Sequence, residues 1–362
     1  MRANLLRYLR EYGGVSFREK PFCEVDALVL SQLSYLKMDG LVPGFGPQEA
    51  VSLRALAKHP DAEHLFSDPV FGPRYRRIFG ILSKSVRYAE IRANYFSEWV
   101  EEDREVQFAA VTLLLGPTSV FVSYRGTDET LVGWKEDFNM GFMRSVPAQR
   151  IALSYLKGVA RYTQGRIVIG GHSKGGNLAI FAAAGAPRSV QSRIRRVYSF
   201  DGPGFQKSFY EREGFVTVRE RCCKIVPEQS LIGMLMNDFQ ESRIIASYGA
   251  GVAQHDLMNW KISGGRFVYL GRMRRHSSRK AEILNHWIDS LSKSQIRIFV
   301  DILYELLSST RAKTVYELVK RPFRLLYAAA RTFLRLDSGS QRSFWEIIGK
   351  LLEAVVHRPV VE

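Results

Sequence analysis

Residues 166–184 read RIVIGGHSKGGNLAIFAAA, and they carry the strongest indication of fold class in the sequence. Its first five residues, RIVIG, are almost wholly apolar, which is typical of a strand buried in a parallel sheet. Residues 177–184 are rich in alanine and apolar side chains, and they predict a buried helix. The glycines between these two runs allow the chain to turn sharply. We therefore predict a strand, a tight turn and a helix in direct succession.

The turn carries the pattern G-x-S-x-G in Gly171, Ser173 and Gly175, which is the pattern of a nucleophile elbow. Such a turn forces the serine into a strained conformation, and the two glycines leave room for the strand and the helix to cross closely. The serine oxygen then stands at a helix N-terminus, where free N–H groups and the helix dipole favour an oxyanion. Ser173 is the candidate nucleophile, and the N–H of Lys174 is a candidate oxyanion donor.

Strand-like and helix-like segments alternate around this motif. Strands are predicted at 106–115, 119–124, 166–170, 197–200, 221–226 and 267–270, with a helix at 148–163. The alternation predicts an α/β protein of the α/β-hydrolase fold, with a mostly parallel central sheet flanked by helices. The first hundred residues read as mainly helical, including 25–36, 47–58 and 74–92. After residue 280 only helices are predicted, at 281–307, 315–336 and 343–356, so we expect a domain over 1–280 and a C-terminal helical appendage over 281–362.

Composition limits the class of protein. The chain has 362 residues, 46% hydrophobic and 24% charged, which suits a globular protein with a sizeable core. The chain has three cysteines and no spacing typical of metal ligands, so we expect no disulfide framework, no metal site and no cofactor. Arginines interrupt the N-terminal segment, and no run is long enough for a membrane-spanning helix. We expect a cytoplasmic location, with peripheral contact to the inner face of the membrane as a further possibility.

Two segments of the sequence resemble motifs of a known protein family. GHSKGGNLA at 171–179 resembles the elbow of class 3 lipases. Tyr124-Arg125-Gly126-Thr127-Asp128, followed by Trp134 and Asp137, resembles the FRGT…W…D signature of the same family. The elbow, the FDGPGF segment at 200–205, QHD at 254–256 and the helical tail more closely resemble an uncharacterised bacterial branch of lipase-like hydrolases. The resemblance covers roughly residues 20–290, and it implies that Thr127 supplies the second oxyanion donor.

A serine hydrolase of this fold needs a histidine downstream of the serine. His276 lies among cations that disfavour an imidazolium, and His286 and His357 lie in the helical tail. His255 follows a glycine-rich loop and precedes the last predicted strand, so it is the best candidate for the base. His172 adjoins the nucleophile and is expected to point elsewhere.

The acid is open between several carboxylates. Class 3 lipases place an aspartate in a D-x-V-P-like segment, but here Lys224 stands at the matched position of Lys224-Ile225-Val226-Pro227-Glu228. Asp201 follows the strand at 197–200 in a context that resembles the acid of pancreatic-type lipases. Asp201 is therefore favoured, with Glu228 as the alternative acid, and Asp256 or no acid as the remaining options.

Two further stretches bear on the substrate. GWKEDFNMGFMRSVP at 133–147 could be a lid or an apolar wall for an acyl group, although such a stripe more often belongs to the core. Cations are concentrated at 266–280 and at 74–87, and the formal net charge is +16. A basic face beside a lipase-like cleft would suit anionic lipid, whereas a solvated surface is the plainer interpretation.

We therefore predict a serine hydrolase that cleaves carboxylic esters through a Ser-His-Asp triad and an acyl-enzyme. The alternative is a catalytically impaired hydrolase-fold protein that binds lipid or a protein partner, as the mismatch at Lys224 suggests. Nucleic-acid binding is not expected, because no recognised binding motif accompanies the basic charge. The sequence does not set the acyl length, the leaving group or the oligomeric state.

Overall fold

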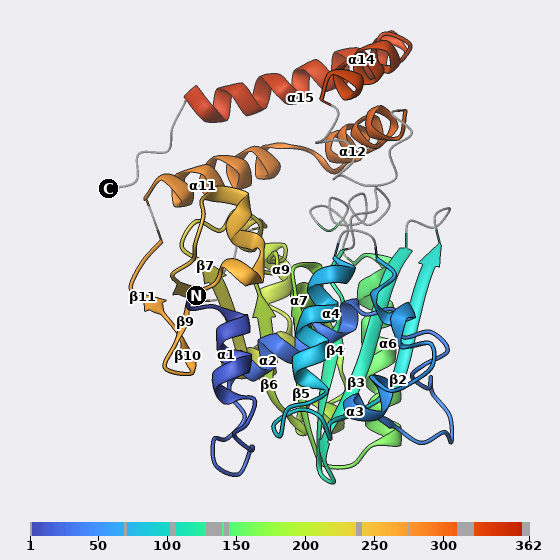
Figure 1. Cartoon of the computed structure of the whole chain (residues 1–362). Coiled ribbons are helices and arrows are strands. Elements are labelled where there is room, and N and C mark those ends of the chain that lie inside the picture. The colour runs from blue at the N-terminus through green and yellow to red at the C-terminus, as the bar shows by residue number, and fades with distance from the viewer. Residues whose placement is uncertain are drawn as a thin grey trace.

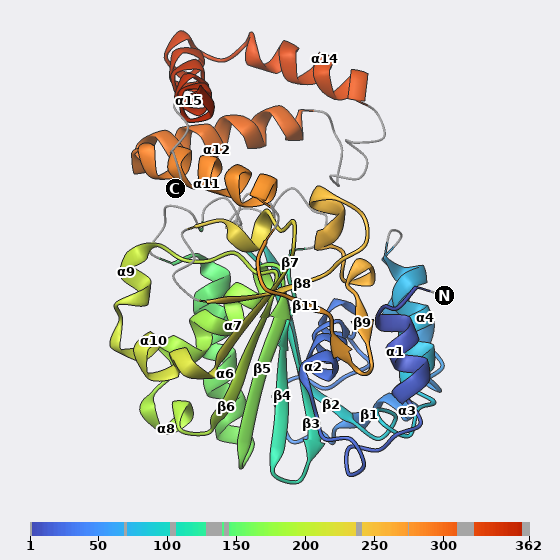
Figure 2. The same cartoon turned by 90° about the vertical axis from the view of Figure 1, so that its left-hand side faces the viewer.

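The computed structural model describes residues 2–68, 71–101, 106–127, 140, 145–236, 241–273, 275–309 and 322–356. A large twisted sheet forms the centre, helices cover both of its faces, and a layer of C-terminal helices lies across one end (Figure 1, Figure 2). This arrangement agrees with the expected α/β class.

The main sheet has the strand order β1-β2-β3-β4-β5-β6-β7-β8-β11. Its strands are β1 (Val51–Ser52), β2 (Arg92–Glu101), β3 (Val106–Gly116), β4 (Ser119–Tyr124), β5 (Arg166–His172), β6 (Ile194–Phe200), β7 (Cys222–Pro227), β8 (Ser242–Ile245) and β11 (Tyr269–Leu270). The five consecutive strands β4 to β8 are parallel, and antiparallel pairs extend the sheet at both sides. A separate antiparallel pair joins β9 (Ile262–Ser263) to β10 (Arg266–Phe267). Since parallel strands end at one edge of the sheet, the loops after β4, β5 and β6 meet there.

One face of the sheet carries the helices on both sides of the elbow in sequence, one before it and four after it. They are α6 (Pro147–Tyr162), α7 (Lys174–Gly185), α8 (Arg188–Gln191), α9 (Lys207–Tyr210) and α10 (Glu213–Val218). The central helix α7 is buried along almost its whole length, because it packs against β5 and β6 on one side and α6 on the other. Its run of alanines lets the helix backbone approach the sheet closely.

The opposite face carries the N-terminal helices. They are α1 (Leu5–Tyr12), α2 (Glu24–Ser31), α3 (Leu53–Leu56) and α4 (Gly72–Leu82), together with 3-10 turns at 33–35 and 62–66. The expected helix at 25–36 is therefore an α-helix followed by a separate 3-10 turn, and the expected helix at 47–58 shrinks to α3. The prediction of a mainly helical first hundred residues was wrong at β2, a ten-residue strand that pairs with β3.

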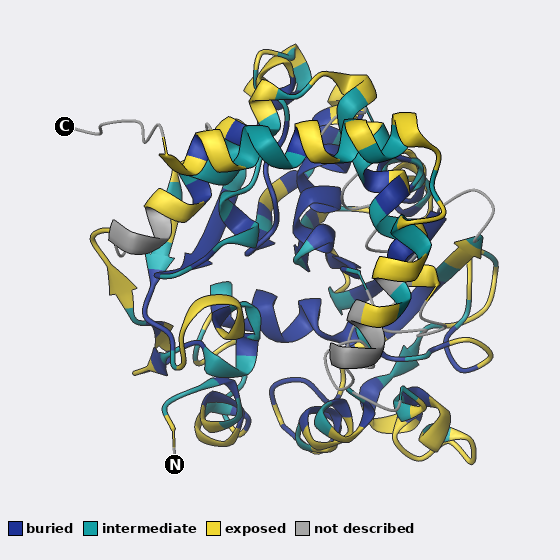
Figure 3. Ribbon diagram, turned by 90° about the horizontal axis from the view of Figure 1, so that it is seen from above, coloured by how far each residue is buried: buried dark blue, intermediate teal, exposed yellow. Residues whose placement is uncertain are grey.

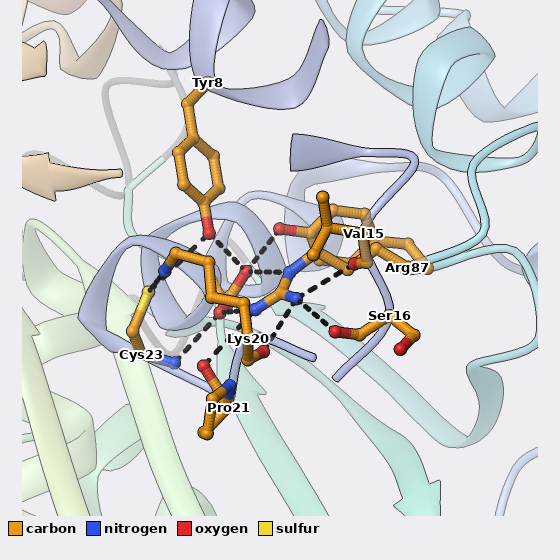
Figure 4. Close-up of polar contacts among 9 residues, drawn as sticks. Tyr8, Val15, Ser16, Lys20, Pro21, Cys23 and Arg87 are labelled. Atoms are coloured by element: carbon orange, nitrogen blue, oxygen red, sulfur yellow. Dashed lines mark hydrogen bonds and ion pairs between the residues drawn. The ribbon is translucent and has the colours of Figure 1, made fainter. Parts of the chain in front are cut away.

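A buried ion pair fastens the N-terminal segment to the rest of the domain (Figure 4). The Arg87 guanidinium donates to both carboxylate oxygens of Asp26, at 2.8 and 2.6 Å, and neither side chain is exposed to solvent. Arg87 also donates to the carbonyls of Val15 and Lys20. The expectation that Arg87 contributes to a basic surface was wrong, because its guanidinium is buried and paired with Asp26.

The C-terminal helices are α11 (Arg275–Ser290), α12 (Lys293–Ser308), α14 (Pro322–Phe333) and α15 (Ser338–Val356). The single helix expected over 281–307 is thus two helices, and the boundary expected at 280/281 falls inside α11. Trp287, Ile347 and Ala354 form a small core of their own. Seen from above, these helices expose many residues while the sheet beneath them is largely buried (Figure 3). No helix in the described part of the chain is both long and apolar enough to span a bilayer.

Candidate active site

Ser173 lies at the sharp turn between β5 and α7. Its backbone has φ 57° and ψ −132°, a conformation that residues other than glycine rarely adopt. Such a conformation costs about 1–3 kcal/mol and persists only where the surrounding structure enforces it. Here the Ser173 N–H donates to the carbonyl of Phe200 at 2.9 Å, which ties the turn to the end of β6.

The two glycines of the motif allow the strand and the helix to cross. A Cβ atom on Gly171 would lie 2.3 Å from the carbonyl carbon of Gly175, and one on Gly175 would lie 2.2 Å from the carbonyl oxygen of Tyr124. Both contacts are with backbone atoms, which cannot move aside without shifting the strand. Any larger residue would therefore force the turn open.

His255 and Asp201 form a hydrogen-bonded pair. Asp201 follows β6, is 1% exposed and has φ 51°. Its Oδ2 accepts a hydrogen bond from Nδ1 of His255 at 2.6 Å, and its Oδ1 accepts one from the hydroxyl of Ser230. A carboxylate held in this way fixes the imidazole with its proton on Nδ1 and leaves Nε2 to accept a proton.

The other candidate acids have contacts of their own. The side chain of Glu228 lies against the N–H of Ser247, at 3.5 Å. Asp256 accepts two hydrogen bonds from Arg74, at 3.0 and 2.8 Å. Asp201 is the candidate acid that accepts a hydrogen bond from the His255 ring.

Ser173 and His255 open into one cavity of about 370 Å³. Thr127 and Lys174, the expected oxyanion donors, also line it. The loop after β4 lies close against the nucleophile, since a Cβ atom on Gly126 would be 3.2 Å from Cβ of Ser173. Apolar side chains make up most of the remaining wall, namely Phe71, Tyr75, Met140, Ile232, Leu235, Met236, Val252 and Leu257.

His172 also lines this cavity, contrary to the expectation that it points elsewhere. Its ring lies beside that of His255, with the ring centroids 4.4 Å apart. Burial lowers the pKa of His172 well below its ordinary value, and the neighbouring His255 and Arg74 act in the same direction. The His172 ring is therefore neutral and carries a single N–H.

Three residues of the site had no signal in the sequence: Tyr35, Arg74 and Ser230. Tyr35 and Arg74 come from the N-terminal helical segment, and each contacts a residue more than a hundred positions away. Ser230 contacts Asp201, 29 positions earlier, through a loop with no motif. Only the tertiary fold brings these residues into contact with His172, Asp256 and Asp201, respectively.

Several sequence-based candidates lie outside the described residues. They are Asp128, Trp134 and Asp137 of the second lipase-like signature, most of the expected lid at 133–147, and His357. Of that lid, Met140 and residues 145–147 are described: Met140 is 5% exposed and lines the cavity, and Pro147 is the first residue of α6. Within the described ranges, no group of three His, Cys, Asp or Glu side chains is arranged to hold a metal ion.

Comparison with known proteins gives one clear relationship. Among curated proteins, none matches this sequence. A solved structure described as the crystal structure of M37 lipase shares 13% identity and a TM-score of 0.38, over 60% of this chain and 70% of that one. The model of the family described as Mbeg1-like matches residues 82–305, which is more than half of the chain and includes Ser173, Asp201 and His255. The chain belongs to the Mbeg1-like family.

Proposed function

We propose that this protein is a serine hydrolase of the α/β-hydrolase, lipase-like type that cleaves carboxylic esters. One observation carries the proposal: a strained serine and a histidine hydrogen-bonded to a buried aspartate line the same largely apolar cavity. Strained residues and buried acid–base pairs cost stability, so they are concentrated where function requires them.

The mechanism follows from the roles of the three groups. Oγ of Ser173 attacks the acyl carbonyl carbon while Nε2 of His255 takes the hydroxyl proton, and Asp201 stabilises the resulting imidazolium. Backbone N–H groups of Thr127 and Lys174 stabilise the oxyanion, and one such donor is typically worth about 3 kcal/mol. The imidazolium then gives its proton to the leaving alkoxide. Water, deprotonated by His255, releases the acid and restores the serine.

The cavity wall supports an apolar acyl group as the substrate portion beside Ser173. Loss of apolar surface from water is worth about 25 cal/mol per Å², so a chain lying along this wall gains affinity with each carbon until the cavity is full. We therefore propose an ester of a fatty or other apolar acid. The chain length at which the gain ends reports the depth of the cavity.

The test is hydrolysis of p-nitrophenyl esters of graded acyl length by the full-length protein. The expected result is measurable turnover that rises with chain length and then levels off, together with loss of at least about 10³-fold in Ser173→Ala. Ser192→Ala is the matched control, because that hydroxyl lies on the exposed surface and contacts the carbonyl of Ser189. Equal turnover by wild type and Ser173→Ala would reject the proposal.

A second candidate is a hydrolase-fold protein that binds lipid or a protein partner without catalysis. The observation that favours it is Lys224, which stands where class 3 lipases carry the acid and which is buried within β7. The hydrogen bond between His255 and Asp201 weighs against it. Saturable binding of a fatty acid by wild type, with no turnover of any ester, is the outcome that would favour this candidate.

We further propose peripheral contact with an anionic membrane surface. The net charge of +16 supports it, as do exposed apolar side chains on and beside the outer helices, such as Leu334 and Trp345. Sedimentation with vesicles tests this point. Binding that requires anionic lipid and weakens as salt rises is expected, and equal binding to neutral vesicles would contradict it.

A further inference from the structure

His172 connects the nucleophile turn to the loop of the base. It is the residue directly before Ser173, and its Nε2 lies 3.0 Å from the backbone carbonyl oxygen of His255. A carbonyl can only accept, so Nε2 carries the proton and donates it. The two imidazole rings also pack against each other, tilted by 33°. His172 thus contacts both the backbone and the ring of the neighbouring histidine.

Tyr35 completes the connection on the other side of His172. Since Nε2 of His172 is protonated and the ring is neutral, Nδ1 can accept a hydrogen bond. The Tyr35 hydroxyl lies 3.4 Å from Nδ1 and 3.4 Å from the backbone carbonyl oxygen of His172, so it can donate its proton to either acceptor of this residue. The same hydroxyl oxygen accepts a hydrogen bond from the N–H of Gly126 at 3.1 Å. Gly126 directly precedes Thr127, the expected oxyanion donor. One chain of contacts therefore joins the oxyanion loop, the nucleophile turn and the loop of the base.

We infer that His172 and Tyr35 are positioning residues that hold the loop of His255 and the loop of Thr127 in fixed positions around Ser173. The inference rests on the proposed hydrolase function. It assigns no chemistry to the His172 ring itself, which acts through the carbonyl that it binds.

The His255 loop needs such a restraint because its own backbone is permissive. Gly249 and Gly251 both have positive φ, at 77° and 56°, and glycine loses the most conformational freedom on ordering. Other contacts also reach this loop: Asp201 and Arg74 bind the side chains of His255 and Asp256, and the side chains of Gln229, Asn259 and Trp260 bind backbone groups of Gly251, Ala253 and Gln254. The contact from His172 differs in that it binds the backbone carbonyl of His255, the proposed base. A displacement of about 1 Å at this point can cost about 100-fold in rate.

The test compares two substitutions of His172 in the full-length protein. His172→Gln keeps a side-chain amide N–H at nearly the reach of Nε2, and His172→Phe keeps a planar ring but has no donor. The expected result is a kcat within about 5-fold of wild type for Gln, a loss of about 10- to 100-fold for Phe, and a KM within about 3-fold for both. Wild-type kcat in His172→Phe, or equal losses in both variants, would overturn the inference.

A second measurement does not depend on activity. The Nδ1 proton of His255 is shared with Asp201 at 2.6 Å, and a proton in such a hydrogen bond gives a separate downfield NMR resonance. That resonance should persist in His172→Gln and broaden through faster exchange in His172→Phe. If wild type turns over no ester, the proposed function fails while this comparison still decides the positioning role. An unchanged resonance in both variants would overturn it.

Tyr35→Phe serves if His172→Phe does not fold. It removes one hydroxyl and retains the ring, which stacks on Tyr75 at 5.7 Å. The expected result is a drop in kcat of about 10-fold with an unchanged KM, because the Gly126 N–H loses its acceptor beside the oxyanion donor. An unchanged kcat would contradict the assignment of Tyr35.

Discussion

Replacing Asp201 with asparagine should inactivate the protein by reversing the tautomer of His255. The carboxylate accepts two hydrogen bonds, from Nδ1 of His255 and from the hydroxyl of Ser230. The oxygen of Ser230 in turn accepts the N–H of Gly233 at 3.0 Å, so its proton points to Asp201. In Asp201→Asn the amide oxygen faces Ser230 and the amide NH₂ therefore faces His255. Nδ1 of His255 must then accept, which places the proton on Nε2 and leaves no base for Ser173.

The size of the loss follows from this change of role. The wrong tautomer in an otherwise intact triad lowers kcat by about 10⁴-fold, or about 5.5 kcal/mol of transition-state stabilisation. The assay is kcat and KM for the best p-nitrophenyl ester, with KM expected to stay within about 3-fold because the cavity wall is unchanged. A loss of less than 10-fold would refute the role assigned to Asp201.

A double variant isolates the contribution of Ser230. In Asp201→Asn combined with Ser230→Ala the amide is free to rotate, so its oxygen can again accept the Nδ1 proton of His255. One net hydrogen bond of about 1 kcal/mol had held the wrong orientation, so the double variant should be about 5-fold more active than Asp201→Asn alone. If the double variant is slower than the single one, the tautomer argument is wrong.

Three further outcomes concern stability. Arg87→Met leaves the Asp26 carboxylate buried without its cation, and urea denaturation should show a loss of about 3–5 kcal/mol; a loss below 1 kcal/mol would contradict the role of the pair. Burial raises the pKa of Asp26, but hydrogen bonds from Arg87 and Tyr88 and the Arg87 charge outweigh it and leave the pKa below its ordinary value. The ionised Asp26 carboxylate therefore stabilises the fold above about pH 4, and this stabilisation is lost as the pH falls further. The difference in Tm between wild type and Arg87→Met should narrow in acid. A difference in Tm that does not change with pH would contradict the lowered pKa of Asp26. Gly175→Ala should lower the free energy of unfolding by about 1–3 kcal/mol, because the added Cβ meets backbone atoms. Gly80→Ala should not lower it, because the space around that Cβ is open. Equal effects of the two substitutions would contradict the close crossing of β5 and α7.

The sequence predicted those parts of the fold in which local signals and tertiary structure agree. The strand at 166–170 and the helix after it follow from apolar runs separated by glycines, and the structure has β5 and α7 there. β2 was missed because a register shift between Asn94 and Ser97, with Tyr95 at φ 54°, breaks the alternation that marks a strand. Its pairing with β3 decides its conformation, and no pattern within the segment reports that pairing.

Some residues of the candidate site could be predicted from the sequence, and others could not. Ser173 is readable because its turn, its glycines and its helix lie within twenty residues. The sequence favoured Asp201 but left Glu228 open, since the two carboxylates follow neighbouring strands; the hydrogen bond between Asp201 and His255 supports Asp201 and has no counterpart in the sequence pattern. The role of His172 was missed because it depends on a backbone carbonyl 83 residues away, and a carbonyl leaves no signature in the side-chain sequence.

The proposed mechanism requires that Ser173 is a nucleophile activated by His255. Treatment with a fluorophosphonate, followed by digestion and mass spectrometry, tests it directly, because the reagent forms a covalent bond with an activated serine oxygen. We expect one adduct per chain on the peptide that contains Ser173, no adduct in Ser173→Ala, and labelling at least about 100-fold slower in His255→Ala. An adduct that survives Ser173→Ala, or labelling at the wild-type rate without the imidazole, would contradict it.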